Sequence, residues 1–128
     1  MDAKNLAELW SAPDNTRLTA KQQSFRLPVH VAAKLAALSD MYPGKSKTQI
    51  VGDLLSAALD QMEQGLKYYP SSRFVFRDED GRDIMEAEGP AVIYRNKANH
   101  YYAELERELG NEEPKPLFAD LWACKEEK

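Results

Sequence analysis

The chain has 128 residues, a formal net charge of −4 and one cysteine, Cys124. This length is typical of one domain, and a single cysteine excludes a disulfide framework within the chain and fits a reducing cytoplasm. No apolar run approaches the roughly 18 residues of a membrane span, so a membrane-spanning helix is not expected. Residues 1–4 are not followed by an apolar segment, so a secretory signal peptide is not expected either.

The net charge of the whole chain conceals two oppositely charged segments. Residues 15–52 contain six lysines and arginines against one acidic residue, a balance of +5. Residues 68–128 contain nine basic and fourteen acidic residues, a balance of −5. A basic segment joined to an acidic one indicates a polyanion-binding part and a part with another task, although ordinary scatter of surface charge also produces such differences.

The first two predicted elements are short. Residues 2–11 are expected to form a helix with one apolar face. Residues 21–27 are predicted to form a strand, because Phe25 and Leu27 share one face of an alternating pattern. The opposite, polar face of this strand consists of Gln22, Ser24 and Arg26.

Two helices separated by a Pro-Gly turn are predicted next. Pro28 suits the start of a helix because the first turn needs no amide donor there, and Pro43 with Gly44 stops that helix. Ser46 is the predicted N-cap of the second helix, and Gln49 completes a capping box. The strand and the two helical stripes supply the expected dimer core: Phe25, Leu27, Val31, Leu35, Leu38, Ile50, Val51, Leu54, Leu55 and Leu59.

The pattern weakens after residue 66. Residues 73–77 are predicted to form a strand, and Asp80 with Gly81 marks a turn that suits a hairpin, although the return strand is poor. Residues 98–109 have the spacing of one helix face. A short amphipathic tail follows, and its apolar face is a candidate anchor for a protein partner because aromatic residues dominate interface hot spots. This face consists of Phe118, Leu121 and Trp122.

A short strand, a helix, a glycine turn and a second helix thus follow one another over residues 21–64. This order, with the sequences QQSFRLP at residues 22–28 and GKSKTQI at residues 44–50, resembles the ribbon-helix-helix family, whose members include the Arc, MetJ and CopG repressors. The resemblance covers about a third of the chain. It implies a mainly α fold with a short β-ribbon, in which a ribbon-helix-helix dimer is followed here by a C-terminal α+β extension.

The residues favour the pairing of two chains independently of this resemblance. A lone seven-residue strand leaves its backbone groups unpaired and buries neither of its large apolar side chains. Two copies paired antiparallel satisfy these groups, and their four helices cover the apolar face. Three regions are therefore expected: an N-terminal arm with a short helix over residues 1–19, a DNA-binding and dimerisation domain over residues 20–66, and an acidic extension over residues 67–128.

A two-stranded ribbon fits the major groove of DNA. The matching strand positions of the family contact bases, which implies this role for Gln22, Ser24 and Arg26. The start of the second helix favours an anion through its free amides and dipole, and the resemblance implies that a DNA phosphate binds there. The expected phosphate contacts are Lys21, Lys45, Ser46, Lys47 and Thr48.

The expected function is that of a sequence-specific transcriptional repressor that binds double-stranded DNA as a homodimer or a dimer of dimers, in the cytoplasm at the nucleoid. Two alternatives stay open: an antitoxin-like module whose C-terminal region binds a protein partner, and a dimeric interaction scaffold that does not bind DNA. An enzyme, a cofactor and a metal site are not expected, because the sequence contains no nucleophile–base pair, phosphate-binding glycine loop or metal-ligand spacing.

Overall fold

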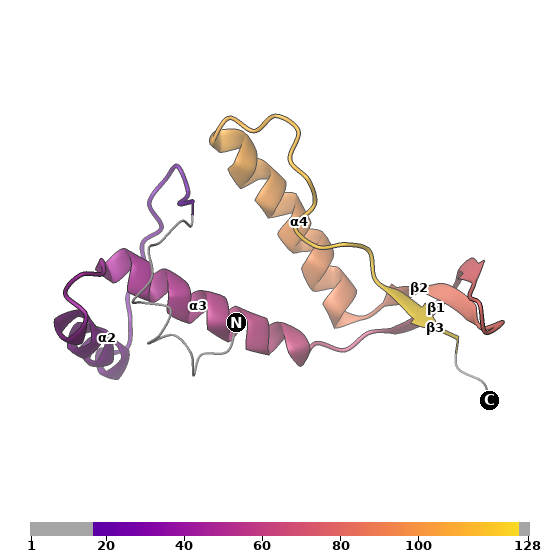
Figure 1. The fold of residues 1–128 in the computed structure, drawn as a ribbon, viewed down its shortest axis with the longest axis horizontal. Helices are drawn as coiled ribbons and strands as arrows, with labels where there is room; N and C mark the ends of the chain where they lie inside the picture. Colours follow the sequence, from indigo (N-terminus) through magenta and orange to yellow (C-terminus); the bar gives the residue numbers. More distant parts are fainter. Residues whose placement is uncertain (1–16, 126–128) are drawn as a thin grey trace. The chain divides into compact units, whose positions relative to one another are not determined.

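The structure, a computed structural model, describes residues 17–125. The chain divides into two compact units, Met1–Gly65 (unit 1) and Leu66–Lys128 (unit 2), whose elements are labelled in Figure 1. The helix expected over residues 2–11 lies outside the described residues. Each unit buries apolar residues of its own.

Unit 1 contains the two expected helices. Helix α2 (Val29–Met41) begins directly after Pro28, and helix α3 (Lys47–Gln64) begins directly after Ser46. The Oγ atom of Ser46 accepts a hydrogen bond from the backbone amide of Gln49 at 3.1 Å. The predicted N-cap is therefore confirmed, and it satisfies one of the amides that the first turn of a helix leaves without a partner.

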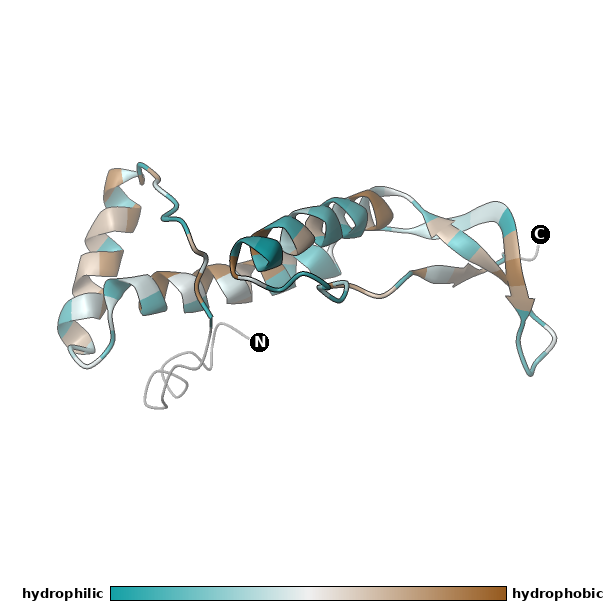
Figure 2. Ribbon diagram, turned by 90° about the horizontal axis from the view of Figure 1, so that it is seen from above, coloured by the Kyte–Doolittle hydropathy of each residue, from teal (hydrophilic) through white to brown (hydrophobic). Residues whose placement is uncertain are grey.

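The core of unit 1 lies between α2 and α3. Leu35 of α2 is buried, and Ile50 and Ala57 of α3 have no exposed surface. Partly buried side chains pack against these three: Val31, Leu38, Tyr42, Val51 and Leu54. Figure 2 shows other apolar positions distributed among polar ones along both helices. Eight large apolar side chains of the described part of unit 1 stay exposed: Leu18, Phe25, Leu27, Val29, Met41, Leu55, Leu59 and Met62.

The expected fold class, mainly α with a short β-ribbon, is wrong. The predicted strand over residues 21–27 is not formed, because no described segment of the same chain supplies the neighbour that a strand needs to complete its hydrogen bonds. The described strands all belong to unit 2, where they form a three-stranded antiparallel sheet in the order β1-β2-β3. Together with helices α2, α3 and α4, this sheet makes the described chain an α+β fold.

The sheet of unit 2 begins with the predicted hairpin. Strand β1 (Tyr69–Arg77) pairs antiparallel with β2 (Asp83–Glu88), although register shifts interrupt the pairing along β1. Gly81 in the connecting turn has a φ of +79°, a conformation that favours glycine. The short strand β3 (Trp122–Cys124), which the sequence analysis did not predict, pairs with the other edge of β2. Strand β2 is therefore the centre of the sheet.

Helix α4 (Pro90–Glu108) starts well before the expected residue 98. Gly89 precedes it with a φ of +116°, and a Cβ atom there would lie 3.1 Å from the carbonyl oxygen of Lys67. Glycine therefore permits the sharp change of direction from β2 into α4. The proline at the first helical position suits a helix start because its missing amide would have no helical partner.

Candidate functional site

An open groove with a volume of about 790 Å³ lies on unit 1, between residues 18–25 and the first half of α3. Lys21 and Gln22 line it from the N-terminal segment, and Lys47 and Thr48 line it from the first turn of α3. Residues that the sequence analysis assigned to base contacts and to phosphate contacts therefore meet at one surface. Folding of unit 1 brings them together across more than 20 positions of sequence.

The same groove has an apolar part. Phe25, Val51 and Leu55 contribute to its lining. Phe25 is 76% exposed and Leu55 is 53% exposed, so water contacts most of the Phe25 ring. Monomeric proteins seldom leave contiguous apolar surface of this kind uncovered. The groove thus combines a basic and polar rim with a surface that a partner would shield from water.

The three predicted base-contacting residues are all exposed. Gln22 lines the groove, whereas Ser24 and Arg26 lie outside its lining. Within residues 17–125, these three side chains form no hydrogen bond or ion pair. The guanidinium of Arg26 therefore keeps all five of its N–H donors available for an external ligand.

The predicted phosphate-binding residues surround the start of α3. Lys47 and Thr48 are exposed in its first turn, whereas Lys45 before the N-cap is half-buried. The hydroxyl of Ser46 is already occupied as the N-cap, by the amide of Gln49. The first turn of α3 contains no acidic residue, so nothing in it offsets the positive end of the helix dipole. This electrostatic arrangement favours an anion at the helix start.

The residues proposed from sequence as a partner-binding face contact other residues of unit 2, although Trp122 stays 49% exposed. Phe118 is half-buried, and its ring lies 5.8 Å from that of Tyr94. The carbonyl oxygen of Leu121 accepts a hydrogen bond from the amide of Ala87 at 3.1 Å. The indole of Trp122 lies edge-on to the ring of Phe76, with 5.2 Å between the ring centroids. These contacts attach the chain before β3 to the rest of the unit.

Two residues of α4 that the sequence analysis did not single out hold this returning segment. Asn99 accepts a hydrogen bond from the amide of Phe118 at 2.7 Å and donates one to its carbonyl oxygen at 3.0 Å. The guanidinium of Arg95 lies over the Phe118 ring, 5.0 Å from its centroid, and donates to the carbonyl oxygen of Ala119 at 3.4 Å. Because the partners are 19 and 24 residues away, no local pattern could have indicated these pairs.

Comparison of the chain with protein-family models, curated proteins and solved structures found no match. Among residues 17–125, no helix is sufficiently long and apolar to cross a membrane. The same part of the chain contains no cluster of three or more histidine, cysteine or carboxylate side chains suited to a metal ion. Function must therefore be inferred from the geometry of the two units.

Proposed function

We propose that the protein is a sequence-specific DNA-binding transcriptional regulator that acts as a homodimer. The observation that carries this proposal is the groove of unit 1, where Lys21 and Gln22 lie beside Lys47 and Thr48. Basic side chains at a helix start without acidic neighbours supply what a DNA phosphate needs, and phosphate contacts provide most of the affinity in non-specific binding. Such a role implies a location in the cytoplasm, at the nucleoid.

The exposed apolar side chains of unit 1 support a second copy of the chain as the partner. Leu55, Leu59 and Met62 follow one another at positions i, i+4 and i+7 of α3, and their exposed fractions are 53%, 46% and 42%. This spacing forms one stripe along the helix. Complete burial of a large apolar side chain contributes about 1.5–3 kcal/mol, so covering the stripe and Phe25 would stabilise a dimer substantially.

Self-association also doubles the polar surface before α2. Two copies related by a two-fold axis present the same surface to each other. Gln22, Ser24 and Arg26 of both copies, which are exposed in the described chain, would then be available to the base edges in the major groove. There Arg26 would bind guanine and Gln22 would bind adenine. The resemblance to ribbon-helix-helix proteins supports these assignments.

The two alternative functions receive less support. An antitoxin-like anchor at Phe118 and Trp122 would need side chains that already form aromatic contacts inside unit 2. A dimeric scaffold that does not bind DNA leaves the +5 balance of residues 15–52 without a purpose. Selection of bound DNA sites separates the scaffold from the regulator, whereas co-purification of a tightly bound protein partner would identify the antitoxin-like module.

The test begins with selection of bound sites from random double-stranded DNA by the purified full-length protein. We expect a palindromic site to be enriched, and Arg26→Ala to lose about 1–3 kcal/mol of binding free energy on that site in fluorescence anisotropy. Lys34→Ala is the matched control, because it removes one positive charge from the exposed surface of α2. A protein that enriches no site, or an Arg26 variant that binds as tightly as the Lys34 variant, would overturn the proposal.

A further inference from the structure

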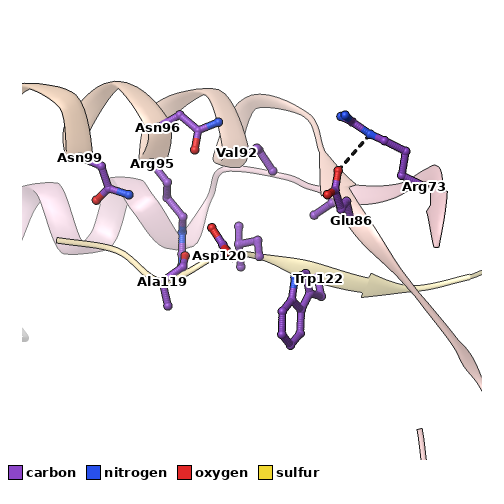
Figure 3. Close-up of a pocket in the computed structure, with 11 residues that line it drawn as sticks. Arg73, Glu86, Val92, Arg95, Asn96, Asn99, Ala119, Asp120 and Trp122 are labelled. Atoms are coloured by element: carbon purple, nitrogen blue, oxygen red, sulfur yellow. Dashed lines mark hydrogen bonds and ion pairs between the residues drawn. The ribbon is translucent and has the colours of Figure 1, made fainter. Parts of the chain in front are cut away.

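Unit 2 contains a polar pocket with a volume of about 230 Å³ (Figure 3). It lies between the β1–β2 hairpin, α4 and the segment that precedes β3. Four charged side chains line it, Arg73, Glu86, Arg95 and Asp120, so the formal charge of its lining is zero. The volume is below the roughly 300–1,000 Å³ of pockets for drug-sized ligands, which restricts any ligand to a smaller molecule.

One pair of these charges is already neutralised. The Nε atom of Arg73 lies 2.9 Å from a carboxylate oxygen of Glu86. By contrast, the side chains of Asn96 and Asp120 form no hydrogen bond or ion pair with any residue of the described chain. In Figure 3, Asn96 lies on α4, and Asp120 lies on the segment that returns before β3. Both residues are exposed and line the pocket, so their polar atoms are accessible to a ligand that enters it.

Arg95 is held ready to bind an anion. Its guanidinium stacks over the Phe118 ring and donates one hydrogen bond to the carbonyl oxygen of Ala119. Most of its five N–H donors remain available after this contact. A guanidinium whose position is determined by the protein loses little conformational freedom on binding and matches the geometry of a carboxylate.

We propose that this pocket binds a small zwitterion of the α-amino-acid class. The ligand's carboxylate would bind Arg95 and Asn96, and its ammonium group would bind Asp120. A ligand with only a negative charge would be repelled by the unpaired carboxylate of Asp120, and one with only a positive charge would face Arg95. A molecule with both charges can pair its carboxylate with Arg95 and its ammonium group with Asp120. The site lies wholly in unit 2 and does not depend on DNA binding by unit 1.

The ligand class is tested on the full-length protein by adding each of the standard L-amino acids at millimolar concentration in a thermal-unfolding assay. We expect one or a few of them to raise the melting temperature, because a ligand that binds only the folded state stabilises it. Isothermal titration calorimetry should then show that the corresponding amine and the corresponding carboxylic acid each bind about tenfold more weakly or worse. Absence of stabilisation by any amino acid would overturn the proposal.

The site itself is tested with variants that keep the fold. Asp120→Asn preserves the size of the side chain, and we expect it to weaken the binding of the responding amino acid about tenfold or more. Glu112→Gln removes a negative charge from an exposed residue outside the pocket and should leave the affinity unchanged. The melting temperature without ligand establishes that both variants are folded. Equal affinity of the Asp120 variant and the unaltered protein would also overturn the proposal.

Discussion

Asn99 shows how one side chain can attach a long connection to a helix. Its amide oxygen accepts from the backbone of Phe118 and its amide nitrogen donates to the same residue, at 2.7 Å and 3.0 Å. Both functional groups of the side chain are therefore used, in a partly buried position. Asn96 lies three positions earlier on α4 and forms no such contact with the described chain. The two asparagines provide a matched pair for measuring the contribution of this clamp.

We expect Asn99→Ala to lower the free energy of unfolding by about 1–3 kcal/mol, because it leaves two backbone groups of Phe118 without their partner. Asn96→Ala should change it by less than about 0.5 kcal/mol, as is usual for exposed positions. Chemical denaturation of both variants measures the difference. If the two substitutions have equal effects, the hydrogen bonds of Asn99 do not stabilise unit 2.

At the scale of elements, α3 has two distinct surfaces. Its first turn has the Ser46 cap and lacks acidic residues, whereas its later turns expose the stripe that includes Leu59. The first surface suits phosphate and the second suits a protein chain. Substitutions at the two surfaces should therefore affect different measurements.

Replacement of Lys47 by alanine tests the first surface. A lysine that contacts phosphate contributes to affinity regardless of DNA sequence, so Lys47→Ala should weaken specific and non-specific DNA about equally. The slope of log affinity against log salt concentration should fall in magnitude by about one. Anisotropy titrations over a series of salt concentrations measure this slope, with Lys97→Ala in unit 2 as a charge-matched control. An unchanged slope would remove Lys47 from the DNA interface.

At the scale of the whole molecule, the basic and the acidic segments of the sequence fall in different compact units. The +5 segment, residues 15–52, belongs to unit 1, and the −5 segment, residues 68–128, belongs to unit 2. Each unit has its own candidate binding surface, a basic groove in one and a polar pocket in the other. These surfaces suit two separate tasks, the binding of DNA by unit 1 and the binding of a small ligand by unit 2.

The oligomeric state is the property of the whole molecule that the DNA proposal requires. We expect sedimentation analysis to find a dimer, and Leu59→Lys to produce monomers because a charge in the stripe would be costly to bury. The Leu59 variant should also unfold at a lower temperature, since unit 1 alone has a small core. Ile93→Lys, at an exposed apolar position of α4, should leave the dimer intact. A monomeric unaltered protein would contradict the prediction.

Local sequence determined the elements whose signals lie within a few residues. Pro28 and the Ser46–Gln49 cap define where α2 and α3 begin, because helix starts depend on the hydrogen bonds of a single turn. The Asp80-Gly81 pair likewise predicted a hairpin, because a tight turn depends on the backbone conformation of its own residues, here a positive φ at Gly81. Leu35 and Ile50 of the apolar stripes are buried in unit 1, whereas Leu55 and Leu59 of the α3 stripe are exposed.

Only the tertiary structure decided that a third strand joins the sheet of unit 2 and that residues 21–27 form no strand. Strand β3 has three residues, too few for any periodicity, and it exists because β2 offers it an edge. Residues 21–27 place Phe25 and Leu27 on one face of an alternating pattern, yet they lack a neighbouring strand within the described chain. The polar pocket and the Asn99 clamp join residues far apart in sequence. Local conformation follows from neighbouring residues, whereas strand pairing and binding surfaces follow from which distant segments meet.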